Sequence, residues 1–238
     1  MKGRLLRPTV FGLGLLWFGS AAADGVVVDK IYHPYVQPLE RELEWRATLQ
    51  DQQPGRPDDL SVYRFAYARS LGEKWLGEVY LVGRQSDDAG FDVAAFEVEA
   101  LRQLSEQGEY WADWGLVFEL EKERALDAWE FAVGALAEKE WGRWSGTANL
   151  FVMQEWGSDV RDELETRLGL QARYRHSPAF EPAIEFYSGE DTRAIGPVAL
   201  GLVRFSGKRQ LHWEAGVVFG VDSKSPDTTL RFLLEFEF

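Results

Sequence analysis

The sequence contains no cysteine and only three histidines in 238 residues. Without cysteine the chain cannot be a disulfide-stabilised scaffold, so its stability has to come from hydrogen bonding and burial. No H-x-x-x-H spacing, calcium-loop spacing or glycine-rich phosphate loop occurs. The acidic pairs Asp58-Asp59 and Asp87-Asp88 are more typical of solvated loops than of ion sites. The sequence therefore predicts neither a metal nor a cofactor.

Long apolar runs and positive charge are also scarce. After residue 23, no stretch reaches the roughly 18 consecutive apolar residues that a membrane-spanning helix needs. Acidic residues number 39 against 26 lysines and arginines, which gives a formal net charge of −13. This balance opposes nucleic-acid binding, because proteins that bind nucleic acid carry a basic surface.

The first 23 residues differ from the rest of the chain and have the three parts of a secretory signal peptide. Three basic residues lie within the first seven, an apolar run follows at residues 10–18, and three alanines end the segment at Ala23. We therefore expect export of the protein and cleavage near Ala23, which leaves Asp24 as the first residue of the mature chain.

From residue 39 onward, apolar and polar residues alternate with a period of two. In the first such segment Leu43 and Trp45 share one face, while Glu42, Glu44 and Arg46 share the other. A helical period would mix these two classes of residue on each face, whereas a strand separates them. The alternation therefore predicts a β-strand with one apolar and one charged face.

The same pattern predicts twelve strands separated by turn residues. Eight segments alternate clearly: residues 39–50, 94–103, 112–121, 129–138, 143–152, 163–174, 211–219 and 228–238. Four alternate less clearly, and they are residues 60–70, 75–84, 179–188 and 194–205. Pro182 and Pro197 weaken the last two, because proline cannot donate a ladder hydrogen bond.

The last predicted strand carries Phe232, Phe236 and the terminal Phe238 on one face. In this feature the chain resembles the outer-membrane β-barrel proteins of Gram-negative bacteria, whose C-terminal strand ends on an aromatic residue. The resemblance implies that these three phenylalanines form a signal for the barrel-assembly machinery. It also implies an outer-membrane location, with membrane lipid and lipopolysaccharide as surroundings.

The fold class predicted is all-β, a single transmembrane antiparallel up-and-down β-barrel of about twelve strands over residues 39–238. A soluble β-sandwich is the alternative, because it also has alternating strands. Its strands are usually five or six residues long, whereas those predicted here run to about ten. The many charges on the polar face also favour a barrel lumen over a solvated sheet face.

Chain ends at the periplasmic side would place one turn near residues 139–140 and an aromatic girdle at the periplasmic interface. The girdle residues would be Trp75, Trp111, Trp141, Trp144, Tyr174, Phe205 and Phe238.

The polar face of the strands would point into the lumen of the barrel. The charged residues expected to line it are Glu40, Glu42, Glu44, Arg46, Arg64, Glu97, Glu99, Glu119, Glu130, Arg143, Glu163, Glu165, Arg167, Arg173, His212, Glu214, Arg231 and Glu235. These charges either pair across the lumen and close it, or line water and form a narrow channel. Because acids outnumber bases, a channel would have a mild preference for cations.

Residues 24–38 precede the first strand and contain the dense segment Tyr32-His33-Pro34-Tyr35. This segment could dock in the lumen, bind a periplasmic partner, or serve as a rigid proline-rich lead-in to the first strand. We favour the lead-in.

The function predicted is a small channel or transporter-like barrel for small polar solutes. A non-conducting structural or interaction barrel, acting through its loops or N-terminal segment, is the alternative. A lipid-modifying enzyme is less favoured, because no histidine–serine pair lies on an outward face. The sequence therefore predicts no catalytic residues and no enzyme.

Overall fold

The computed structural model describes residues 26–51, 53, 59–87 and 89–238. The predicted signal peptide at residues 1–23, the Ala23 cleavage point, Asp24, Asp58 and Asp88 lie outside the described residues. No helix among the described residues has the length and apolarity that a membrane span requires.

Twelve β-strands form the described fold, which confirms the predicted class and strand number. They are β1 (Arg41–Gln50), β2 (Ser61–Ser70), β3 (Trp75–Ser86), β4 (Ala89–Gln103), β5 (Asp113–Glu123), β6 (Trp129–Trp141), β7 (Trp144–Trp156), β8 (Glu163–Tyr174), β9 (Glu181–Ser188), β10 (Arg193–Arg204), β11 (Gln210–Gly220) and β12 (Thr228–Glu237). Pro182 and Pro197 are both accommodated, in β9 and β10 respectively.

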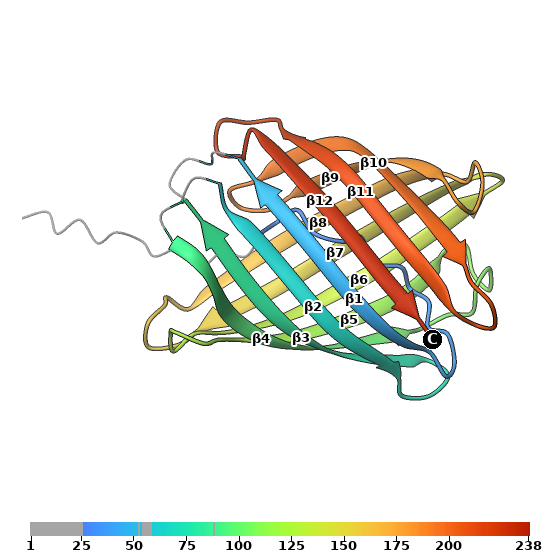
Figure 1. Ribbon diagram of the computed structural model, residues 1–238, viewed down its shortest axis with the longest axis horizontal. Coiled ribbons are helices and arrows are strands. Elements are labelled where there is room, and N and C mark those ends of the chain that lie inside the picture. Colours follow the sequence, from blue (N-terminus) through green and yellow to red (C-terminus); the bar gives the residue numbers. More distant parts are fainter. Residues whose placement is uncertain (1–25, 52, 54–58, 88) are drawn as a thin grey trace, which may run out of the picture.

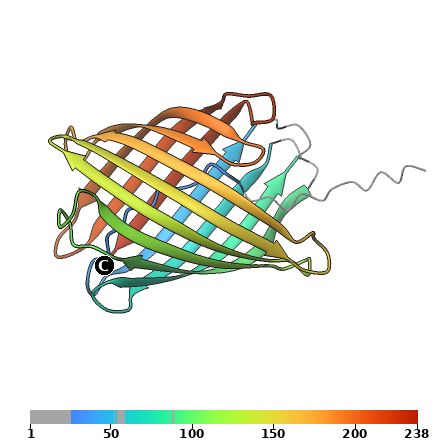
Figure 2. The same ribbon diagram turned by 180° about the vertical axis from the view of Figure 1, so that it is seen from behind.

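Each strand pairs antiparallel with its neighbours in sequence, and β1 pairs with β12 to close the barrel. The strands are tilted against the barrel axis in both views (Figures 1 and 2). We call the end of the barrel where Arg41 lies hydrogen-bonded to Phe238 the C-terminal rim. The opposite rim is the end where Gln50 of β1 pairs with Thr229 of β12.

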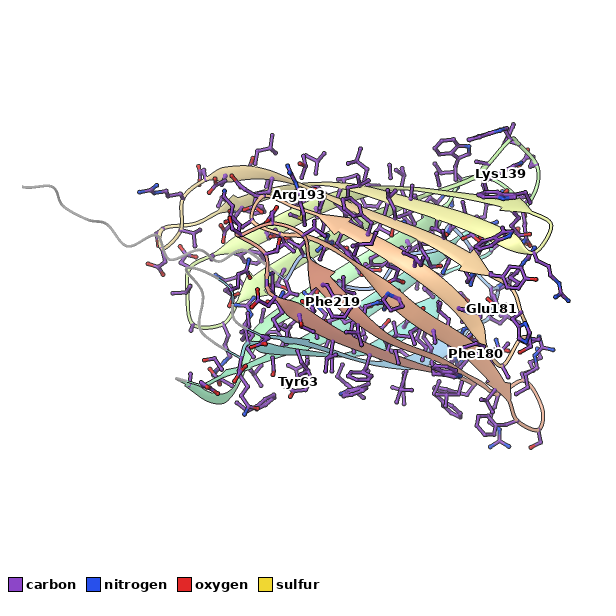
Figure 3. All side chains as sticks on the ribbon, turned by 90° about the horizontal axis from the view of Figure 1, so that it is seen from above. Tyr63, Lys139, Phe180, Glu181, Arg193 and Phe219 are labelled. Atoms are coloured by element: carbon purple, nitrogen blue, oxygen red, sulfur yellow. The ribbon has the colours of Figure 1, made fainter. Side chains whose placement is uncertain are left out.

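The outward face of the barrel is apolar along its length. Large side chains such as Phe65, Val98, Phe131, Leu150 and Ile184 are exposed there. Apolar surface of this extent is unusual for a protein in water and is typical of a lipid-facing wall. Side chains project from the wall along the whole barrel in Figure 3, with Lys139 toward the C-terminal rim and Arg193 toward the opposite rim.

Aromatic residues gather at the C-terminal rim, where strands begin or end. Trp144 contacts Tyr174 with a ring-centroid distance of 5.1 Å, and Phe205 contacts Phe236 at 6.2 Å. Trp111 and Trp141 are exposed at the same end. This arrangement matches the aromatic girdle expected from the sequence.

Residues 26–38, which we call the inner segment, lie inside the barrel. Figures 1 and 2 show this part of the chain as a blue trace that passes through the interior. Its residues Val28 and Tyr32 are buried against inward-facing side chains of several strands. The inner segment is therefore part of the core and not only a lead-in to β1.

Two details differ from the sequence-based expectation. The turn between β6 and β7 consists of Gly142 and Arg143, not of residues 139–140, because β6 extends to Trp141. Leu39 does not begin β1. It lies in the turn that joins the inner segment to β1, has a positive φ of 69° and is 83% exposed.

Candidate functional site

The first half of the inner segment, residues 26–31, packs into an apolar cluster on the side of the opposite rim. Its Val26, Val28 and Ile31 are buried there by side chains from several strands, namely Val62, Val82, Ala95, Tyr187, Ala194 and Val218. Gly169 permits close approach of the segment, because a Cβ at this position would lie 2.7 Å from Ile31 Cδ1. The barrel wall is thus shaped to this half of the segment.

Two charged residues of the same half are paired with the barrel wall. Asp29 accepts a hydrogen bond from Arg46 at 2.8 Å and lies 3.5 Å from Arg64. Lys30 donates to Glu44 at 2.7 Å. All five side chains lie in the barrel interior, where a charge is tolerated only if it is paired.

The second half, residues 32–38, packs Tyr32 and Val36 into a second apolar cluster and is also held by hydrogen bonds. The backbone N–H of Tyr32 donates to Asn149 at 2.7 Å, and the Asn149 amide donates back to the Tyr32 carbonyl at 2.9 Å. The Tyr32 hydroxyl donates to Glu99 at 2.8 Å. Tyr32 is therefore fixed at both its backbone and its side chain.

Further polar contacts follow toward the C-terminal rim. His33 Nδ1 lies 2.5 Å from Glu138, the Tyr35 hydroxyl donates to Asp113 at 2.8 Å, and the Val36 N–H donates to Gln103 at 2.9 Å. Each contact joins the segment to a different strand. The second half of the segment thus lies against the neighbouring strands β4, β5 and β6, on one side of the barrel wall.

Cavities lie beside the inner segment in the part of the lumen that the described residues form. A cavity of about 410 Å³ lies toward the C-terminal rim, and a cavity of about 40 Å³ lies toward the opposite rim. Tyr32 lines both cavities and therefore stands between them. The larger cavity is lined by seven glutamates against one lysine and two arginines, and the smaller by seven acids against two arginines. Both cavities carry an excess of negative charge.

Within the described part of the chain, carboxylates approach one another in three places where they could hold a cation. The groups are Glu40, Glu42 and Glu237; Glu42, Glu44 and Glu78; and Glu97, Glu99 and Glu119, with ligand oxygens within 4.8 Å in each group. Burial, together with the neighbouring Glu237 carboxylate, raises the pKa of Glu40 to about 7 from its ordinary value of 4.5. Burial and, after it, the neighbouring carboxylate thus disfavour ionisation of Glu40 at the C-terminal rim.

Most of the residues expected in the lumen lie at inward-facing strand positions. These are Glu42, Glu44, Arg46, Arg64, Glu97, Glu99, Glu119, Glu130, Glu165, Arg167, Arg173, His212, Glu214, Arg231 and Glu235. Glu40 lies directly before β1 and lines the larger cavity. Several pair with one another: Arg231 lies 2.7 Å from Glu214, and Arg167 lies 3.5 Å from Glu119.

Two residues of the expected set lie elsewhere. Arg143 is exposed in the turn between β6 and β7, so its expected place in the lumen is corrected. Glu163 is exposed at the end of β8 near the opposite rim, outside the packed interior. Of the expected assembly signal, Phe232 and Phe238 are exposed on the outward face and Phe236 is half-buried beside Phe238.

Sequence reasoning missed the residues through which the inner segment is held. Asp29 and Lys30 belong to the segment itself, and Glu138 and Asn149 of the barrel wall contact His33 and Tyr32 respectively. A signal was present in the sequence, since Asp29 and Lys30 lie among valines in a segment otherwise suited to burial.

No protein-family model matches the chain, and no curated protein matches it. Solved structures do match in fold. An outer-membrane channel from Pseudomonas putida F1 is 14% identical, with a TM-score of 0.55, over 88% of this chain and 98% of that one. The KdgM porin, solved in complex with disordered oligogalacturonate, is 10% identical, with a TM-score of 0.52, over 83% and 98%.

The β domain of the Bordetella autotransporter BrkA is also similar, at 13% identity and a TM-score of 0.50, over 84% of this chain and 99% of that one. At these identities the likeness concerns the fold. The chain has the closed β-barrel fold of Gram-negative outer-membrane proteins, as its C-terminal strand indicated.

Proposed function

We propose that this protein is an outer-membrane channel for small cationic solutes, and that residues 26–38 close its lumen at rest. The observation that carries the proposal is the inner segment itself, which separates two acid-lined cavities at Tyr32. Removal of the segment from the lumen would join these cavities into one passage through the barrel.

The charge of the lining supports a preference for cations. Glutamates outnumber basic residues in the larger cavity, and a ring of carboxylates favours cation passage. Glu99, which is fully buried and bound to Tyr32, would contribute less than Glu235, which borders the larger cavity. We therefore expect Glu235→Gln to reduce cation selectivity more than Glu99→Gln does.

The cellular setting follows from the same proposal. The signal peptide at residues 1–23 would direct export, and Phe232, Phe236 and Phe238 would engage the barrel-assembly machinery. In the outer membrane the C-terminal rim would face the periplasm, and the outward apolar face would contact lipid and lipopolysaccharide. The larger cavity would then open toward the periplasm.

A non-conducting interaction barrel is the second candidate function. The number of buried contacts on residues 26–31 favours it, because a segment held by paired charges resists displacement. The sequence-based prediction that the protein is not an enzyme stays a prediction. Loss of a hydrolase activity in the variant His212→Ala would contradict it.

Single-channel conductance in a planar bilayer distinguishes the two candidates. The mature chain is compared with a variant that lacks residues 24–37, both refolded and checked by heat-modifiable gel migration. We expect small or rare current steps from the complete chain and frequent larger steps from the variant. A salt gradient then measures the selectivity, which we expect to favour cations.

A silent variant that migrates as a folded barrel would contradict the channel proposal and favour the interaction barrel. Equal conductance of the two chains would show that the inner segment does not close the lumen. Anion-selective steps would contradict the proposed solute class.

A further inference from the structure

The first and last strands meet at the C-terminal rim through glutamates that lie directly opposite one another. Glu42 of β1 pairs with Glu237 of β12, and Glu44 pairs with Glu235. Like charges at directly opposed positions on neighbouring strands destabilise a sheet. The point at which the barrel closes therefore carries an electrostatic cost that a bound cation would remove.

Two glutamates of this group, Glu42 and Glu235, have no hydrogen-bond or ion-pair partner among the described residues, and Glu42 is the more buried of the two. Its side chain is buried, with 5% of the residue exposed, and it lines the 410 Å³ cavity. Within the described part of the chain it forms neither a hydrogen bond nor an ion pair. A buried carboxylate in this state needs a cationic partner or a proton.

The three carboxylate groups of the lumen differ in what already neutralises them. The Glu42–Glu44–Glu78 group contains the Lys30 ammonium, 2.7 Å from Glu44 and 3.8 Å from Glu78. The group of Glu97, Glu99 and Glu119 is likewise paired with arginines.

In the group of Glu97, Glu99 and Glu119, Arg64 lies 3.5 Å from Glu97, and Arg167 lies 3.5 Å from Glu119. Among the described residues, no lysine or arginine lies within ion-pair distance of the third group, Glu40, Glu42 and Glu237. His212, 3.4 Å from Glu237, is its one basic partner at that distance among the described residues, and Lys30 acts on Glu42 only from farther away. This third group, which we call the rim triad, is therefore the one that lacks a permanent cation.

We propose that the rim triad binds one divalent cation of the calcium type. Calcium takes carboxylate oxygens at about 2.3–2.6 Å, so two of its ligands can lie up to about 5 Å apart. The triad oxygens lie within 4.8 Å of one another, which fits ligands of a shared ion. The adjoining cavity leaves room for the water molecules that complete a calcium shell. The smaller magnesium ion demands a tighter octahedron.

The location of the rim triad gives the ion a structural role. Glu42 and Glu237 come from the first and last strands, so one ion would bridge the strands whose pairing closes the barrel. The inference does not rest on the channel proposal, because a closed barrel can bind a cation at its rim. Failure of either proposal leaves the other standing.

Isothermal titration calorimetry of the refolded mature chain in detergent at pH 8, with calcium chloride as titrant, tests the proposal. We expect one saturable site in the complete chain and affinity weakened by about tenfold or more in Glu42→Gln. Glu73→Gln removes an exposed acid from a turn at the same rim and should leave the affinity unchanged. Glu40→Gln, outside the strands, provides a second test should Glu42→Gln not fold.

The proposal is overturned if titration of the complete chain with calcium gives no saturable heat of binding. That result would mean that protons neutralise the triad. Equal affinity of Glu42→Gln or Glu40→Gln and the complete chain would also overturn it, by placing the ion elsewhere. Tighter binding of magnesium than of calcium would contradict the proposed type of ion.

Discussion

The two halves of the inner segment are held in different ways. Residues 26–31 combine an apolar cluster with the buried pairs of Asp29 and Lys30, and they border a cavity of about 40 Å³. Residues 32–38 pack Tyr32 and Val36 into a second apolar cluster, are held further by hydrogen bonds to polar side chains, and border a cavity of about 410 Å³. The lumen is therefore closed tightly near the opposite rim and loosely near the C-terminal rim.

The largest effect on the difference between the two halves is expected when the negative charge of Asp29 is removed. In Asp29→Asn, Arg46 and Arg64 lose a buried anionic partner, which we expect to cost about 3 kcal/mol. The loss should appear as release of the inner segment, since the strands keep their own pairing. Urea unfolding in lipid vesicles measures the free energy, and bilayer recording should find more frequent open steps.

Asp162→Asn is a matched control, because Asp162 is exposed between β7 and β8. It should change neither the unfolding free energy nor the frequency of open steps. A similar small effect in both variants would mean that the paired charges do not anchor residues 26–31.

A smaller effect is expected in the second half, from Tyr35→Phe. This change removes one hydrogen bond to the Asp113 carboxylate, for a loss of about 1–2 kcal/mol in the same urea experiment. The noise of the recorded bilayer current should increase, because residues 32–38 become more mobile. The channel should not open fully, because residues 26–31 stay in place. Tyr67→Phe, at an exposed tyrosine that forms no hydrogen bond among the described residues, is the control. A loss equal to that of Asp29→Asn would remove the distinction between the halves.

The smallest effect is expected at the turn that follows both halves. Leu39 has a positive φ, which is costly for a branched side chain and acceptable for asparagine. Leu39→Asn should stabilise the barrel by at most about 1 kcal/mol and leave conductance unchanged, since Leu39 is exposed. Destabilisation would mean that the Leu39 side chain supports the inner segment.

The fold was predictable because the outward face repeats a simple rule. Apolar residues alternate with polar ones in eight segments, and the terminal phenylalanines identify the class of barrel. The ends of the strands were less predictable. A turn as short as Gly142-Arg143 lets the alternation continue across it, so Arg143 was placed in the lumen although it is exposed.

The four segments with weaker alternation became β2, β3, β9 and β10, and their irregularity has a physical reason. Their inward faces carry apolar residues, including Val62, Leu76, Val82 and Ala194, which belong to the clusters that also contain inner-segment residues. An apolar inward face has no use in a water-filled pore. The apolar residues on these inward faces were thus a sequence signal for an occupied lumen. The alternation of apolar and polar residues alone could not show which segment occupies it.

The turn at Pro38 and Leu39 joins the inner segment to β1 with almost no intervening chain. A displaced segment would remain tethered to the rim, within a reach of at most about 45 Å for its thirteen residues. Such a short tether keeps the local concentration of the segment in the millimolar range, whatever the amount of protein in the membrane. Return to the lumen is then a first-order event, and a free peptide of the same sequence would compete only at millimolar concentration.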